Sequence, residues 1–191
     1  MKRTAKVLSV ILALAMVFCL VPTANVGAAA EPVGQVKFAT MSDVHFYPQS
    51  LTGDGCPEWL SFCRNDCKEY EESEAIIQTA LNTLRARVER EGIDYLLLPG
   101  DLTRYSEKQA HVELAAKLRQ FEADTGVPVI VIDGNHDINT YKAVTFENGV
   151  KEAAEPITAQ GFYDVYEDLG YDLADSFYAI ENGSVPAVTR T

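Results

Sequence analysis

Three short polar motifs in this chain each follow directly on an apolar stretch that is typical of a buried β-strand. They are Asp43-Val44-His45, Gly100-Asp101 and Gly134-Asn135-His136-Asp137, and segments with helical periodicity separate them. In open α/β sheets, ligands bind beyond the carboxyl ends of the strands. The three motifs are therefore expected to meet in one crevice of an α/β fold with a largely parallel sheet.

Apolar periodicity and turn residues predict the elements between the motifs. Apolar runs predict buried strands at 36–41, 95–98, 128–132 and 177–180. Helical spacing predicts one helix over 74–91, ending at Gly92, and a second from a capping box at Ser106 and Gln109 to near Gly126. A further helix is expected after Thr158, and residues 46–72, rich in glycine, proline and cysteine, are predicted to form a loop or insertion.

The first thirty residues have the features of a secretory signal peptide. Lys2, Arg3 and Lys6 precede an uncharged apolar run at 7–21, and small residues follow at 27–30. The run is about 15 residues long, short of the roughly 20 needed to cross a bilayer. We therefore expect an exported protein, whether secreted, periplasmic or at the cell surface, whose folded part is 31–191 and has no stable membrane span. A retained membrane anchor is the other interpretation.

The charge balance argues against nucleic-acid binding. The chain has a formal net charge of -12, and removal of the three positive charges of the leader lowers it to about -15. Binding to nucleic-acid phosphates needs a basic face, and no cluster of Lys and Arg follows Ala30. We expect no nucleic-acid partner.

Three cysteines follow the leader, at Cys56, Cys63 and Cys67. In an exported protein they favour one disulfide and one remaining thiol, with the pairing open. Their spacing is poorly suited to a structural zinc site, because no second Cys or His pair lies nearby.

The motif residues include side chains that bind metals. Asp43 and His45 stand two residues apart, so both side chains point the same way in an extended chain, and a carboxylate with an imidazole suits zinc, iron or manganese. Asp101 follows a glycine at a strand end, where its two oxygens can bridge two ions. Asn135 offers an amide oxygen to a second cation without adding charge. Each motif alone also fits an ordinary polar turn.

The remaining histidines are expected to differ in role. His136 would project beside the ions, where it can give a proton to a departing alcohol oxygen. His111 lies in the middle of a predicted helix with no partner motif, and we assign it no function.

Taken together, the motifs resemble the first three sequence blocks of the calcineurin-like metallophosphoesterases. That family has Asp-x-His, then Gly-Asp, then Gly-Asn-His-Asp or Gly-Asn-His-Glu, and the match covers roughly residues 36–137. The resemblance implies a sandwich of two β-sheets flanked by helices. It also implies a site with two divalent ions, of iron, manganese or zinc, that hydrolyses phosphate mono- or diesters.

The resemblance further implies a role for each motif residue. Asp43 and His45 would bind the first ion, Asp101 would bridge the two, and Asn135 would bind the second. His136 would assist the phosphate or the leaving group, and Asp137 would orient His136 from behind. Arg104 stands where several branches of the family have an Asp that pairs with the catalytic histidine, and there it is expected to contact a substrate phosphate.

The chain departs from the family in one further respect. The family completes its site with another histidine and a Gly-His-x-His block, whereas no histidine follows His136 here. We therefore expect the N-terminal portion of the domain, incomplete at its C-terminus, with slow hydrolysis or none. The alternative is a secreted, non-catalytic binding or metal-binding module. The enzyme interpretation requires the side chains of Asp43, His45, Asp101 and Asn135 to converge on one centre.

Overall fold

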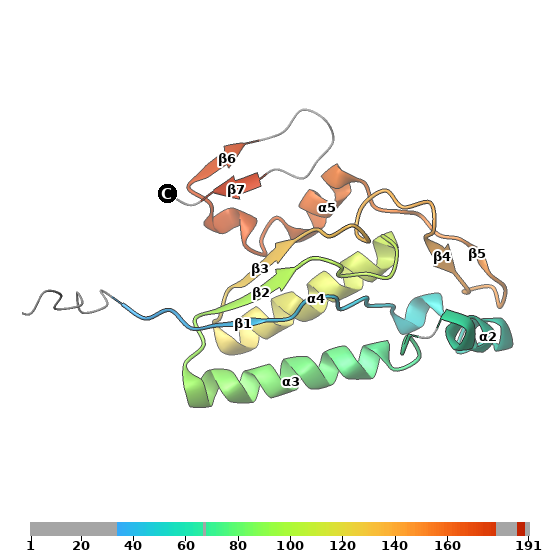
Figure 1. Cartoon of the computed structure of the whole chain (residues 1–191), viewed down its shortest axis with the longest axis horizontal. Coiled ribbons are helices and arrows are strands. Elements are labelled where there is room, and N and C mark those ends of the chain that lie inside the picture. Colours follow the sequence, from blue (N-terminus) through green and yellow to red (C-terminus); the bar gives the residue numbers. More distant parts are fainter. Residues whose placement is uncertain (1–33, 67, 179–186, 190–191) are drawn as a thin grey trace, which may run out of the picture. The chain divides into compact units, whose positions relative to one another are not determined.

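The computed structural model describes residues 34–66, 68–178 and 187–189. The chain divides into two units, Met1–Gln35 and Val36–Thr191, and every helix and strand named in Figure 1 belongs to the second. The predicted signal peptide and Cys67 lie outside the described residues. Within the described part, no helix is both long enough and apolar enough to cross a bilayer.

A three-stranded parallel sheet lies at the centre of the second unit (Figure 1). Its strands are β1 (Phe38–Thr40), β2 (Tyr95–Pro99) and β3 (Val129–Ile132), in the order β1-β2-β3. The register pairs Thr40 with Leu97 and Leu97 with Ile130. The predicted parallel sheet is confirmed, and because all three strands run the same way, their carboxyl ends share one edge.

Two long helices connect these strands, as predicted. They are α3 (Ser73–Glu91), between β1 and β2, and α4 (Lys108–Thr125), between β2 and β3; α4 packs against α3 and β3. Each helix ends at a glycine in the left-handed conformation, Gly92 with φ 66° and Gly126 with φ 68°, whose N–H closes the last turn. Glycine adopts this conformation without strain.

The predicted capping box at Ser106 is wrong. The N-cap of α4 is Glu107, with no side-chain capping bond, and the Ser106 hydroxyl instead accepts a hydrogen bond from the Thr140 N–H at 3.0 Å. Ser106 has φ 60°, so it lies in a turn that joins this loop to the segment after β3.

The segment predicted as a loop contains a helix. Within 46–72 the structure has a 3-10 turn, η1 (Gln49–Leu51), and the helix α2 (Pro57–Asp66). Pro57 is tolerated because the first helical position needs no N–H bond. Trp59 is buried and stacks on Tyr47 with 4.6 Å between ring centres, so tertiary packing of aromatic residues stabilises this helix.

The two described cysteines of this segment do not pair with each other. Cys56 and Cys63 are both free thiols, and Cys63 is buried. The expected disulfide therefore does not join these two residues.

Smaller elements complete the mixed α/β fold. Two antiparallel hairpins follow β3, formed by β4 (Val144–Thr145) with β5 (Glu152–Ala153) and by β6 (Ser176–Tyr178) with β7 (Ala187–Thr189). Between the hairpins lie α5 (Ala159–Tyr166) and a 3-10 turn, η2 (Tyr171–Leu173). The helix expected after Thr158 is confirmed, since the Thr158 hydroxyl accepts the Gly161 N–H at 3.0 Å. The expected α/β class, with a parallel sheet and flanking helices, is confirmed.

Candidate metal centre

The first two motifs lie side by side beyond the carboxyl ends of β1 and β2. The Asp43 N–H donates to the Gly100 carbonyl at 3.3 Å, and the His45 N–H donates to the Asp101 carbonyl at 2.9 Å. The segment after β1 thus continues along the segment after β2 by backbone hydrogen bonds. This pairing brings the two motifs together.

Three of the predicted ligands converge. Asp43, His45 and Asp101 each offer one ligand atom, and these atoms all lie within 4.8 Å of one another. All three residues have positive φ angles, 55°, 45° and 51° respectively. Such backbone is uncommon for residues other than glycine and costs on the order of 1–3 kcal/mol at each position. Strain concentrated in three neighbouring residues that could together hold a metal ion is typical of a functional site.

The third motif touches the second through glycines. Gly100 has φ 94°, and a Cβ atom there would lie 2.8 Å from the Gly134 Cα. A Cβ atom on Gly134 would collide with the backbone nitrogen and side chain of Asp101. The two loops therefore meet backbone to backbone, and the glycines of both motifs are needed for this contact.

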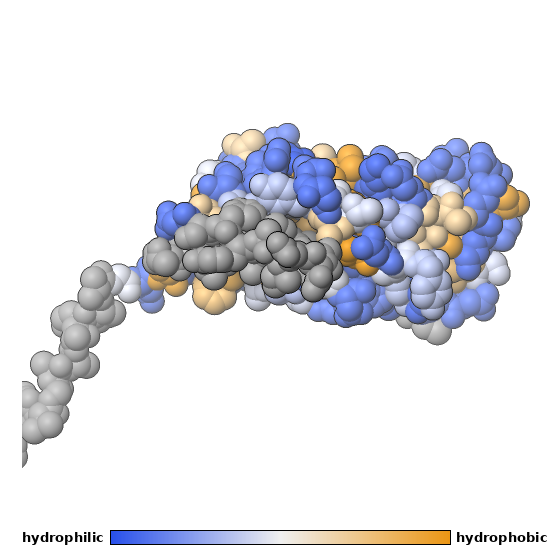
Figure 2. Space-filling view, turned by 90° about the horizontal axis from the view of Figure 1, so that it is seen from above, coloured by the Kyte–Doolittle hydropathy of each residue, from blue (hydrophilic) through white to orange (hydrophobic). Residues whose placement is uncertain are grey.

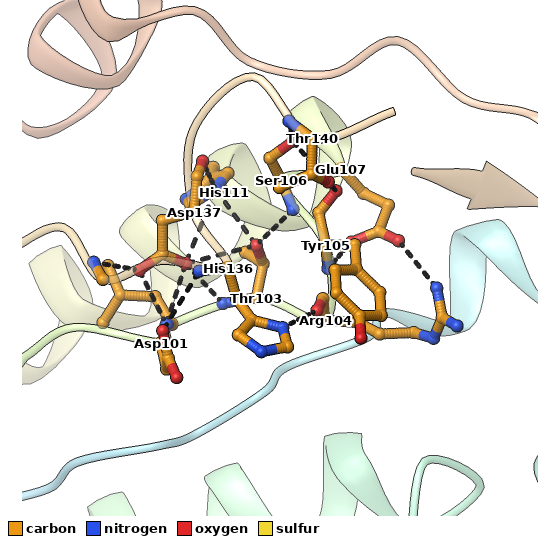
Figure 3. A network of polar contacts seen from close by, with 12 residues as sticks. Asp101, Thr103, Arg104, Tyr105, Ser106, Glu107, His111, His136, Asp137 and Thr140 are labelled. Carbon is orange, nitrogen blue, oxygen red and sulfur yellow. Dashed lines mark hydrogen bonds and ion pairs between the residues drawn. The ribbon is translucent and has the colours of Figure 1, made fainter. Parts of the chain in front are cut away.

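The Asp137 side chain joins the same two loops (Figure 3). Its buried carboxylate accepts the Leu102 and Thr103 N–H groups, both at 2.9 Å, and the Gly134 N–H at 2.8 Å. Burial raises the pKa of Asp137, while these backbone donors act in the opposite direction. Among the described contacts none joins this carboxylate to the His136 ring, and the role of Asp137 in orienting His136 stays a prediction.

His136 is held by other groups. Its Nδ1 lies 2.7 Å from the Arg104 carbonyl oxygen, which can only accept, so Nδ1 carries a proton and donates it. Its ring stacks on Tyr105, with 4.5 Å between ring centres, and meets the edge of His45 at 4.7 Å. The backbone N–H of His136 donates to the Asp101 carboxylate at 3.1 Å. Figure 3 shows the imidazole between Asp101 and Tyr105.

The environment of His45 suits a metal ligand. Its Nδ1 is buried and has no hydrogen-bond partner among the described residues, and its Nε2 lies 3.4 Å from the Lys68 ammonium. Burial, and then the charge of Lys68, lower the pKa of His45, so the ring stays neutral, as metal binding requires. Two carboxylates and a neutral imidazole fit zinc, iron or manganese. Sequence reasoning missed Lys68, which carries no motif and follows α2.

Asn135 lies in the same turn as the other residues of its motif. It stands between Gly134 and His136 and is exposed. Its assignment to a second ion stays a prediction.

Arg104 contacts other side chains of the protein. Its side chain is buried, with its guanidinium 4.5 Å from the Phe62 ring centre and 4.7 Å from that of Tyr105. It pairs with Asp66 at 3.4 Å and with Glu107 at 3.6 Å. Burial raises the pKa of the fully buried Glu107, and the positive charge of Arg104 acts in the opposite direction, so the arginine serves as its counter-charge. The contact of Arg104 with a substrate phosphate stays a prediction, and in this structure its side chain is paired with Asp66 and Glu107.

His111 belongs to the buried network beneath the centre, although its sequence context indicated no partner. Its Nε2 lies 3.1 Å from the Thr103 hydroxyl and 3.0 Å from the Asp137 carbonyl oxygen, and its Nδ1 lies 3.0 Å from the Tyr166 hydroxyl. Burial lowers the pKa of His111 to about 3. A neutral His111 therefore connects α4 and α5 to the loops that bear the centre.

A comparison with protein families agrees with this geometry. The family model for calcineurin-like phosphoesterases matches residues 36–185, a span that contains all three motifs. A search among curated proteins returned no match.

Proposed function

The chain belongs to the calcineurin-like phosphoesterase family, and we propose that it is an exported enzyme that hydrolyses phosphate mono- or diesters with two divalent metal ions. The observation that carries this proposal is the convergence of Asp43, His45 and Asp101 within 4.8 Å. Asp43 and His45 would hold the first ion, Asp101 would lie between the two, and Asn135 would complete the second position. The chemistry that such ions supply is polarisation of the phosphate and activation of water as a nucleophile.

His136 is proposed to transfer a proton at its Nε2 atom. Because the Nδ1–H is committed to the Arg104 carbonyl at 2.7 Å, Nε2 is the ring atom left to face a ligand. A doubly protonated His136 can give the Nε2 proton to the departing alcohol oxygen. Tyr105, stacked on the ring, fixes the plane in which that proton is presented.

We expect hydrolysis by the 191-residue chain to be slow. The converged group offers three side-chain ligands, and the exposed Asn135 is the proposed fourth, so a second ion would have few protein ligands and weak affinity. A non-catalytic metal-binding module is the alternative, and it would bind the metal without any hydrolysis.

Metal binding and hydrolysis are therefore measured separately. Mn²⁺ is titrated into the full chain, with the free ion followed by electron paramagnetic resonance, and a chromogenic phosphodiester is then supplied. We expect the wild type to bind Mn²⁺, Asp101→Asn to bind it at least about tenfold more weakly, and turnover to stay below about one per second. The control is Asp133→Asn, which removes an exposed carboxylate from the loop that follows β3.

Two results decide the matter. Equal Mn²⁺ affinity of Asp101→Asn and wild type would refute the metal centre. Mn²⁺ binding with no detectable phosphodiester or phosphomonoester hydrolysis would favour the non-catalytic module.

A further inference from the structure

Two lysines, Lys68 and Lys142, lie close to the candidate metal centre, and a third, Lys151, follows Lys142 in the chain, although the chain as a whole carries a net charge of -12. We call Lys68, Lys142 and Lys151 the basic rim. Lys68 follows α2, and the other two lie in the segment that forms β4 and β5. Figure 2 shows hydrophilic residues, in blue, over much of the end of the second unit that carries β4 and β5.

Contacts connect the basic rim to the centre. The Lys68 ammonium lies 3.4 Å from His45 Nε2. The Lys142 ammonium lies 4.7 Å from the centre of the Tyr105 ring, which stacks on His136. Each of these lysines is thus at most two side chains away from the converged ligands.

The position of the rim is fixed by Arg104. The Arg104 guanidinium donates to the Lys142 carbonyl at 3.3 Å and packs on Phe62, over which the Lys151 ammonium lies at 4.9 Å. Buried Arg104 therefore holds the backbone at Lys142 and packs on the same Phe62 ring as the Lys151 side chain.

The three ammonium groups have no carboxylate partners within the described ranges 34–66, 68–178 and 187–189. By contrast, Lys108 pairs with Glu155 at 2.7 Å, and Lys117 pairs with Glu74. All three rim lysines are exposed. Unpaired, exposed ammonium groups beside a phosphate site attract anions.

We propose that the substrate carries, besides the phosphate that is hydrolysed, a second anionic group, a phosphate or a carboxylate, which Lys68 binds and the rest of the basic rim attracts. This inference rests on the proposed function of the centre. With a cation held at His45, the Lys68 ammonium would be repelled from the ring, and its exposed side chain would be available to an anion beside it. Lys68 therefore selects substrates with two anionic groups over esters of neutral alcohols.

Non-hydrolysable probes test the proposal. Ethylphosphonate, 3-phosphonopropionate and ethylenediphosphonate have a phosphonate in common and differ in the second group, and their Kd values are measured by calorimetry on the Mn²⁺-loaded full chain. We expect each probe with two anionic groups to bind about fivefold more tightly than ethylphosphonate, a difference of about 1 kcal/mol. The preference should shrink at high ionic strength, since exposed charges are screened.

Substitutions assign the effect to the rim. In Lys68→Ala the ratio of the Kd of ethylphosphonate to that of each probe with two anionic groups should fall to about one, and in Lys142→Ala it should fall partly. Lys37→Ala, at the amino end of β1, should leave it unchanged. In addition, Lys68→Ala should bind Mn²⁺ at least as tightly as wild type, because it removes a repelling charge.

The outcomes separate this inference from the proposed function. If Mn²⁺ does not bind, the metal centre is refuted and the inference with it. If Mn²⁺ binds but no probe is preferred over ethylphosphonate, the inference alone is overturned. The same holds if the preference survives in Lys68→Ala, since the second anionic group then contacts the metal rather than Lys68.

Discussion

Replacement of Asp137 by alanine should be among the most damaging single changes in this protein. The carboxylate is fully buried and accepts the N–H groups of Leu102, Thr103 and Gly134 at 2.8–2.9 Å. Removal leaves three backbone donors beneath the candidate centre without an acceptor. A buried unsatisfied donor costs about 1–3 kcal/mol, and partial entry of water reduces the sum, so we expect Asp137→Ala to lower the free energy of unfolding by about 3–5 kcal/mol.

Asp137→Asn should cost less, about 1–3 kcal/mol. One amide oxygen still accepts backbone N–H groups, but the new NH₂ group then faces another donor. Urea unfolding followed by far-UV circular dichroism measures both losses, with the dependence on urea compared between variants. Asp133→Ala is the matched control, since Asp133 is an exposed carboxylate four residues earlier in the same loop. Its effect should stay within about 0.5 kcal/mol.

One result would refute this reasoning. If Asp137→Ala lowers the free energy of unfolding by less than about 1 kcal/mol, or by no more than Asp133→Ala does, then the carboxylate does not join the two loops in solution. The affinity for Mn²⁺ should also fall in Asp137→Ala, because the loop that bears Asp101 loses its hydrogen bonds to this carboxylate.

Three further substitutions test other parts of the centre. Burial lowers the pKa of His111 from 6.5 to about 3, so the unfolded chain takes up a proton at this residue at a higher pH than the folded chain does. The free energy of unfolding should therefore fall by about 1.4 kcal/mol per pH unit as the pH drops from 6.5 toward 3. Urea unfolding at several pH values should show that His111→Asn lacks this component. In Gly134→Ala the new Cβ atom meets the Asp101 backbone and side chain, and Mn²⁺ titration should show weaker binding. Arg104→Met removes the counter-charge of buried Glu107 and should cost about 3–5 kcal/mol in urea unfolding, part of which Glu107→Gln should restore.

Each of these expectations has an opposite result. An unchanged pH profile in His111→Asn would mean that this ring takes up a proton in the folded state. Wild-type Mn²⁺ affinity in Gly134→Ala would mean that the two loops do not touch. Simple addition of the Arg104 and Glu107 effects would mean that these two side chains do not interact.

The features that sequence predicted correctly are local ones. Helices that end at Gly92 and Gly126 follow from spacing and from the freedom of glycine at positive φ. Strands that end in polar motifs follow from short apolar runs, and parallel pairing then brings Asp43 and Asp101 to one edge.

The features that sequence missed depend on contacts distant in the chain. The helix α2 is stabilised by Trp59 stacked on Tyr47, whereas the glycines and prolines of the segment 46–72 indicated a loop. The sequence pattern could not reveal that Arg104 pairs with the buried Glu107. Lys68 lies in that same segment and reaches His45 only through the fold.

Two residues of the motif Gly134-Asn135-His136-Asp137 stabilise the contact between the loops, and the proposed proton donor, His136, lies between them in the sequence. Gly134 permits the close approach of two backbones, and Asp137 joins the loops through three N–H groups. His136, carried between them, receives its orientation from the Arg104 carbonyl rather than from a carboxylate. A carbonyl cannot accept the imidazole proton permanently or carry a negative charge, so it orients the ring without stabilising the imidazolium as an aspartate would. The position of Arg104 therefore matters to His136 through its backbone, and its side chain serves the packing that keeps that backbone in place.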